Sequence, residues 1–183
     1  LGCMQPLATH APARFATHAR PGTVPLAVGL SMTLPGLPVV WAGDEFGLTG
    51  VDGEMSRTPI PWERADEPEV AARIALYREL IGLRRTHPSL QTGGFRWLHV
   101  GEDVVAFVRE AADESVLVVA ADADLDVEIP APLVLGADRA EALFGDATLG
   151  VASDGTVLVS ADGPSFAVWR LPGVNPPAWP AAS

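Results

Sequence analysis

The stretch LPGLPVVWAGDEFGL, residues 34–48, carries the pattern that decides the fold. Its short apolar run 37–41 predicts a strand buried on both faces, as in a parallel sheet. Asp44 and Glu45 follow this run, and neighbouring side chains of a strand point to opposite faces, so they do not form a facing acid pair. We therefore expect a structural rim beside a site whose chemical residues lie elsewhere. One carboxylate would accept hydrogen bonds from loop amides or from an arginine, for which Arg57 is the first candidate.

The segments on either side of this stretch have helical patterns. The apolar segment 23–34 predicts a helix that Pro35-Gly36 ends. Downstream, Gly, Pro, Asp and Thr residues over 47–63 predict a long loop. Apolar residues then recur every three or four positions over 67–86, and His87-Pro88 follows them, which predicts a second and longer helix. This order of elements is typical of layered α/β folds.

The rest of the chain changes to short strands separated by Gly, Asp and Pro turns. Six runs have this character: 94–100, 104–109, 115–121, 125–129, 156–160 and 166–171. Such a series predicts an antiparallel β-sandwich. We therefore divide the chain into an α/β region at 1–90, a sandwich at 91–172 and a proline-rich irregular tail at 173–183. A βα barrel that ends in a β-sandwich gives this order, and so do generic α/β layers followed by a second domain.

Composition and charge exclude several classes of function. The formal net charge of −11 argues against nucleic acid and anionic membranes as partners. Cys3 is the single cysteine, so no disulfide framework is predicted, and the histidines lack metal-ligand spacing. No transmembrane run and no signal peptide are recognisable, so we expect a cytoplasmic protein without metal or other cofactor. The first residue is Leu1, which suggests a trimmed or partial chain.

The longer stretch LPGLPVVWAGDEFGLTGVDGEMSRTPIPW, residues 34–62, resembles the end of the catalytic barrel in the α-amylase superfamily, glycoside hydrolase family 13. Members carry a pattern like P-G-x-P-x-x-Y-x-G-(D/E)-E-x-G, followed by an arginine and a P-M-P-W segment. Trp41 takes the aromatic position and Ile60 the methionine position. The segments LRRTHPSL and SFAVWRL also resemble the family's last barrel helix and C-terminal β domain. The matching residues of the long pattern are Pro35, Gly36, Pro38, Gly43, Asp44, Glu45, Gly47, Arg57, Pro59, Pro61 and Trp62.

This resemblance covers most of residues 5–171 and implies the end of a (β/α)8 barrel followed by an antiparallel β-sandwich. It further implies a retaining hydrolase of α-linked glucans or glucosides, in which an Asp nucleophile and a Glu acid/base lie on barrel strands four and five. Neither strand is present in this chain. A third family carboxylate lies in an Asn-His-Asp motif, where this chain has Thr9-His10-Ala11. Ala11 therefore replaces that carboxylate, and its methyl group accepts no hydrogen bond.

The resemblance also implies substrate-binding roles for His10, Arg14, Arg57 and Trp62. Each has a structural alternative. His10 would otherwise be an ordinary half-buried histidine, while Arg57 and Trp62 would fix the long loop by a salt bridge and by packing.

Three hypotheses of function follow. The first is the C-terminal portion of an α-glucan or α-glucoside hydrolase, inactive alone, that binds α-linked glucose oligosaccharides once its barrel is completed. The second is a noncatalytic α-glucan-binding or assembly module that uses the β domain. Exposed aromatic residues would favour it, although strand positions predict that Trp97 and Trp169 pack in the core. The third is one half of a split enzyme, which associates with an amino-terminal fragment or forms a homo-oligomer.

Overall fold

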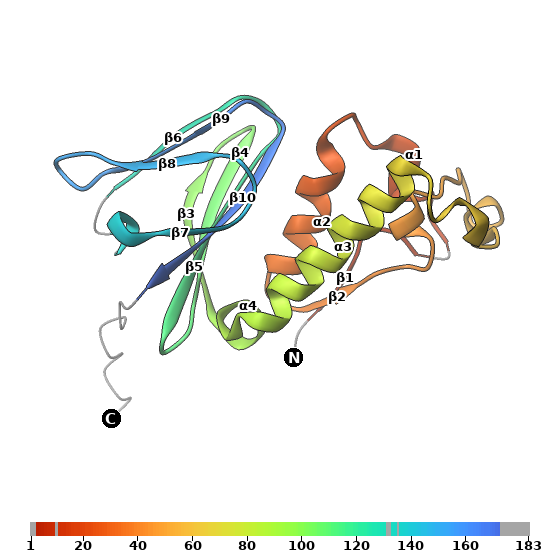
Figure 1. The fold of residues 1–183 in the computed structure, drawn as a ribbon, viewed down its shortest axis with the longest axis horizontal. Coiled ribbons are helices and arrows are strands. Elements are labelled where there is room, and N and C mark those ends of the chain that lie inside the picture. The colour runs from red at the N-terminus through yellow and green to blue at the C-terminus, as the bar shows by residue number, and fades with distance from the viewer. Residues whose placement is uncertain (1–2, 10, 131–132, 135, 173–183) are drawn as a thin grey trace. The chain divides into compact units, whose positions relative to one another are not determined.

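The computed structural model describes residues 3–9, 11–130, 133–134 and 136–172 (Figure 1). The chain forms two compact units, Leu1–Thr86 and His87–Ser183, called unit 1 and unit 2 below. The predicted irregular tail, 173–183, lies outside the described residues.

Unit 1 contains a parallel pair of strands connected through helices. Strand β1 (Met4–Pro6) leads through α1 (Phe15–His18) and α2 (Thr23–Thr33) to β2 (Leu37–Val39), and Met4 lies opposite Leu37 in parallel register. Helix α3 (Pro68–Thr86) packs against α2. The loop between β2 and α3 contains three 3₁₀ turns, Asp44–Phe46, Met55–Arg57 and Trp62–Arg64.

The two predicted helices of this unit are confirmed, and the predicted strand is confirmed as a member of a parallel pair. The expectation that this strand is buried on both faces is wrong, because Leu37 is 62% exposed. Among the described residues β2 pairs with β1 and with no other strand.

Arg84 fixes the end of α3 to the turn between α2 and β2. Its guanidinium donates to the carbonyl oxygens of Met32 at 2.6 Å, Leu34 at 3.2 Å and Gly36 at 2.6 Å. The first two bonds satisfy carbonyls at the C-terminal end of α2, which lack partners within the helix, and the third holds the turn that follows. Gly36 has a φ of 128°, and a Cβ there would lie 2.4 Å from the carbonyl oxygen of Cys3, so this turn requires glycine.

Unit 2 begins with helix α4 (Pro88–Thr92) and continues as two antiparallel sheets. The larger sheet has the order β3 (Gly94–Val100), β4 (Val104–Glu110), β5 (Glu114–Ala121), β10 (Ser165–Pro172) and β7 (Glu141–Phe144). The smaller sheet has the order β6 (Leu125–Ile129), β9 (Val157–Ala161) and β8 (Thr148–Val151), and a 3₁₀ turn spans Ala137–Arg139. One apolar cluster joins the two sheets; it includes Leu117, Val119, Trp169, Val127, Ile129 and Val159.

The six predicted strands of the sandwich are confirmed to within one residue at each end. Trp169 packs in the core as predicted, with 4% of its surface exposed. The same prediction for Trp97 is wrong, because this residue is 49% exposed. It lies on β3, one of the two edge strands of the larger sheet, which pairs with β4 alone within the described part of the chain.

Glu114 ties the start of α4 to the start of β5 within unit 2. Its Oε2 lies 2.9 Å from His87 Nδ1, and its Oε1 accepts from the backbone nitrogen of Ser89 at 3.1 Å and from Ser89 Oγ at 2.9 Å. Burial alone would raise the pKa of the Glu114 carboxyl. The hydrogen bonds from His87 and Ser89 favour the charged form and together hold that pKa below its ordinary value of 4.5.

We expect the stability of unit 2 to fall as the pH drops through the lowered pKa of Glu114. The unfolded carboxyl takes up its proton at a higher pH than the folded one. The stabilisation that the ionised Glu114 carboxylate gives to unit 2 is therefore fully present above the ordinary pKa. It is lost as the pH falls from there through the lowered pKa of the folded state. Glu114→Gln should cost about 1–3 kcal/mol at neutral pH and should weaken the pH dependence. Urea midpoints at about pH 7 and about pH 3.5 would measure both effects. The exposed Glu128→Gln on β6 is the control, and an unchanged pH profile in Glu114→Gln would contradict this account.

Candidate functional site

A buried polar cluster surrounds the first carboxylate of the acid pair. Arg14, which is 2% exposed, places its Nη1 3.2 Å from Asp44 Oδ1. Its Nε and Nη2 donate to the carbonyl oxygen of Ser56 at 3.0 and 2.7 Å, and its backbone nitrogen donates to the carbonyl of Gly50 at 2.8 Å. The planar guanidinium makes the three side-chain bonds at once with a rigid fork of donors that a lysine lacks. Arg14 thus joins the segment after β1, the turn after β2 and the following loop.

Asp44 is a buried carboxylate with one strong partner. Burial raises its pKa above the ordinary value of 3.8, although the charge and hydrogen bond of Arg14 oppose the shift. Its Oδ2 is buried and has no hydrogen-bond partner among the described residues. Its arginine partner is Arg14 and not Arg57, the candidate that the sequence suggested. Arg57 donates to the carbonyl of Gly53 at 2.8 Å and pairs with Glu54 at 3.2 Å, so it is held within the exposed loop.

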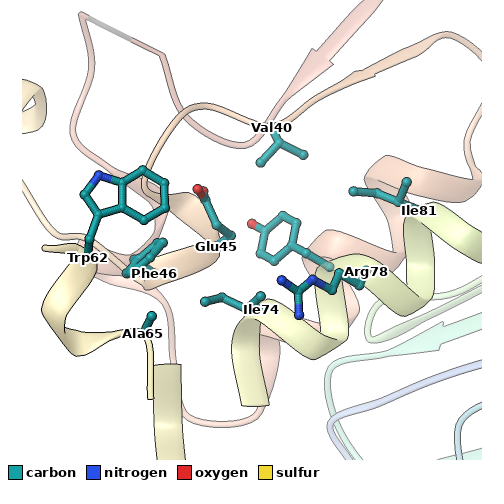
Figure 2. Close-up of a pocket in the computed structure, with 9 residues that line it drawn as sticks. Val40, Glu45, Phe46, Trp62, Ala65, Ile74, Arg78 and Ile81 are labelled. Carbon is teal, nitrogen blue, oxygen red and sulfur yellow. The ribbon is translucent and has the colours of Figure 1, made fainter. Parts of the chain in front are cut away.

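The second carboxylate, Glu45, lines a groove of about 360 Å³ in unit 1, which Figure 2 shows in close-up. Glu45 Oε2 accepts from the backbone nitrogen of Gly43 at 2.9 Å, within its own turn. Trp62 lies on the same side of the groove as Glu45 in this view, is 69% exposed, and meets Phe46 edge to face with 5.4 Å between ring centroids. Burial, and then the charge of Asp44, raise the pKa of the Tyr77 phenol, which stays protonated at neutral pH.

The segment that follows β1 holds the position of the missing carboxylate. Ala11 is exposed, and its backbone nitrogen lies 3.5 Å from Thr9 Oγ1. His10 lies outside the described residues. The structure therefore brings Arg14 and Asp44 together and places Glu45 and Trp62 on one groove, while Arg57 stays in its own loop. Contact between substrate and His10, Arg14, Arg57 or Trp62 stays a prediction.

Sequence reasoning missed two participants of this region. Ser56 contributes a carbonyl oxygen to Arg14 and donates its own hydroxyl to the carbonyl of Pro12 at 3.1 Å. No side-chain pattern signals a backbone acceptor, so no reading of the sequence would find it. Tyr77 lies in the apolar stripe of α3, so its position predicts only that the side chain is buried. The position gives no sign that the phenol lies near carboxylates.

Metal binding and membrane insertion gain no support from the described part of the chain. Its His, Cys, Asp and Glu side chains nowhere form a group of three or more that could hold a metal ion. Within the same residues, no helix is both long enough and apolar enough to cross a membrane.

Sequence comparison finds relatives whose names are alpha-amylase, neopullulanase and cyclomaltodextrinase. No protein-family model matches the chain. Neopullulanase 2 from Thermoactinomyces vulgaris is 36% identical over 96 residues, which cover 51% of this chain and 16% of that protein. Alpha-amylase 2 from Dictyoglomus thermophilum is 30% identical over 102 residues, 51% of this chain and 17% of that protein. The matched part therefore spans less than one fifth of either relative.

Structural comparison extends the likeness to nearly the whole chain. The alpha-amylase from Geobacillus thermoleovorans, solved in complex with acarbose, shares the fold with a TM-score of 0.79 and 22% identity, over 93% of this chain and 39% of that one. The fold class is thereby confirmed as the end of an α/β barrel followed by an antiparallel β-sandwich. The relatives are named alpha-amylase, neopullulanase and cyclomaltodextrinase, so the matched half of this chain is similar to a part of such enzymes, in keeping with its resemblance to glycoside hydrolase family 13.

Proposed function

We propose that this chain forms the last part of the catalytic barrel, residues 1–90, and the C-terminal sandwich, residues 91–172, of a retaining hydrolase of α-linked glucans or glucosides. The ion pair between Arg14 and Asp44 carries this proposal. Arg14 follows β1 and Asp44 follows β2, and the C-terminal ends of parallel strands meet at one edge of a sheet. Barrel enzymes carry their active sites at that edge. The names of the relatives support the α-glucan substrate.

The acid pair contributes to the rim of such a site and not to its chemistry. Retaining hydrolysis needs a carboxylate nucleophile and a carboxylic acid that face each other roughly 5 Å apart across the sugar. Asp44 is buried and ion-paired with Arg14, while Glu45 accepts a hydrogen bond from its own turn. Neither is placed to attack an anomeric carbon, so both catalytic groups would come from other barrel strands.

We expect no measurable hydrolysis of maltooligosaccharides or p-nitrophenyl α-glucoside by the purified chain. The described residues hold no facing carboxylate pair at the C-terminal edge of β1 and β2, and position 11 is alanine. Release of glucose and of p-nitrophenol over several hours would be the measurement. Activity that follows the protein through two further chromatographic steps would show that this account of its chemistry is wrong.

A second candidate is a noncatalytic α-glucan-binding module, and Trp97 favours it. The indole is half exposed on β3 and is held edge to face by Phe95 at 4.8 Å and by Phe107 at 5.6 Å between ring centroids. A rigid aromatic ring that faces solvent suits the apolar face of a sugar. Maltooligosaccharide binding that persists without turnover and disappears in Trp97→Ala would favour this function over the first.

A further inference from the structure

We propose that Ser56 is a positioning residue for the segment that carries position 11. Residues 50–56, called the clamp loop below, hold this segment after β1 and thereby fix where the residue at position 11 meets the sugar. This inference rests on the proposed function and deepens it, because it names a residue that acts on the reaction through its neighbours and does not touch the substrate.

Ser56 contacts the chain directly beside position 11. The residue is fully buried, with 0% of its surface exposed. Its Oγ donates to the carbonyl oxygen of Pro12 at 3.1 Å, and Pro12 is the residue that follows Ala11. Its own carbonyl oxygen accepts from Arg14 Nη2 at 2.7 Å and from Arg14 Nε at 3.0 Å. A single residue of the clamp loop therefore holds the segment at two places shortly after position 11.

The other end of the clamp loop holds the same segment further along. The carbonyl oxygen of Gly50 accepts from the backbone nitrogen of Arg14 at 2.8 Å and from Thr17 Oγ1 at 3.0 Å. The backbone nitrogen of Gly50 donates to Thr17 Oγ1 at 2.9 Å. Together with the bonds of Ser56, these contacts fix the course of the chain from Pro12 to Thr17.

The clamp loop is closed by its own contacts. The carbonyl oxygen of Asp52 accepts from the backbone nitrogen of Ser56 at 2.8 Å, and Asp52 Oδ1 accepts from the backbone nitrogen of Met55 at 2.9 Å. A Cβ at Gly50 would lie 2.7 Å from the carbonyl oxygen of Met55 and 2.8 Å from Ser56 Cα, so the two ends of the loop touch. A loop with hydrogen-bonded turns and touching ends holds Ser56 in a fixed place, as support for a functional group requires.

Position 11 has little hold of its own. Ala11 is exposed, and its backbone nitrogen lies 3.5 Å from Thr9 Oγ1, which is long for a hydrogen bond. The place of this residue therefore depends on the chain that follows it. Misplacing a group of an active site by about 1 Å can cost roughly 100-fold in rate. Because Ser56 is buried and its hydroxyl and carbonyl are bonded to Pro12 and Arg14, its effect on the reaction is indirect.

Hydrogen exchange of the purified chain tests whether Ser56 holds the segment. Ser56→Ala removes the donor to the Pro12 carbonyl and adds no atom that could clash. Exchange in peptides that cover residues 11–17 should become roughly 3–10-fold faster, which corresponds to one lost hydrogen bond. Ser89→Ala is the matched control, since Ser89 is also fully buried and loses a bond of 2.9 Å to Glu114 in unit 2. It should leave exchange over 11–17 unchanged.

Kinetics test whether this hold matters for the reaction. The enzyme is a fused chain that completes the barrel, supplies the nucleophile and the acid/base, and carries Ala11→Asp. Adding Ser56→Ala should lower kcat about 10- to 100-fold and change KM much less, because the misplaced carboxylate acts mainly in the transition state. The loss should be much smaller when position 11 keeps its alanine, since the two positions are then not coupled. A merely structural role would lower the melting temperature without this dependence on position 11.

Three results would decide against one or other part of the account. Unchanged exchange over 11–17 in Ser56→Ala would overturn the inference. So would an unchanged kcat when Ser56→Ala is added to the active Ala11→Asp enzyme. A fused chain that stays inactive after Ala11→Asp would count against the proposed function, whereas faster exchange in Ser56→Ala would still show that the clamp loop holds the segment.

Discussion

Replacing Arg14 by methionine should unfold unit 1 while unit 2 stays folded. The change leaves the buried carboxylate of Asp44 without its cation and removes both donors to the Ser56 carbonyl, although methionine keeps most of the side-chain volume. Breaking a buried ion pair from one side costs about 3–5 kcal/mol, because the remaining charge has no compensation. Such a loss is a large share of the stability of a small folded unit.

Urea titration followed by peptide-resolved hydrogen exchange would separate the two units. Arg57→Met is the matched control, since its pair with Glu54 is exposed and exposed pairs contribute little. The double variant Arg14→Met/Asp44→Leu should recover part of the loss, because it removes both buried charges. If Arg14→Met kept the parent midpoint in unit 1, the structural role would be refuted. Its predicted contact with substrate would then be the better account of the residue.

The sequence predicts the elements whose own pattern is strong. The apolar stripe of α3 is buried in part, the apolar runs of β4 and β5 are buried almost continuously, and β6 buries every second residue. Burial of these apolar residues is the force that forms the elements. The sequence does not predict strand β1, because its three residues, Met4 to Pro6, are too few to show a periodicity. They form a strand because they pair with β2. Strands β7 and β8 are not predicted for a similar reason, since each has only four residues and buries little of its surface.

The candidate site likewise has a part that the sequence predicts and a part that only the folded chain shows. The motif around Asp44 and Glu45 identifies the rim, but the partner of Asp44 lies 30 residues earlier in the chain, and the sequence suggested Arg57 instead. The choice between two arginines depends on which of them is buried. Arg14 lies beneath the loop and Arg57 on its surface, and only the folded chain shows that difference. The groove is also a tertiary feature, because it joins residues of α3 with residues of the segment that connects β2 to α3.

Restoring a carboxylate by Ala11→Asp should raise turnover about 100-fold or more in a fused chain that completes the barrel. The resemblance places position 11 where related hydrolases hold their third carboxylate against the sugar. A preorganised group that meets charge as it develops contributes on the order of 10²–10³ in rate. Its advantage is realised mainly in the transition state, so KM should change much less than kcat.

Two properties of the same variant separate this prediction from a packing effect. Ala11 is exposed, so the new carboxylate need not be buried and the melting temperature should stay close to that of the parent. Ala11→Asn introduces a side chain with the shape of aspartate but without its charge, and it should recover little of the turnover. Ala42→Asp places the same charge at another exposed alanine, shortly after β2, and should recover none of it. A lower melting temperature without a gain in rate would show that the motif around Ala11 is misplaced. The predicted role of His10, which depends on the same alignment, would then fail with it.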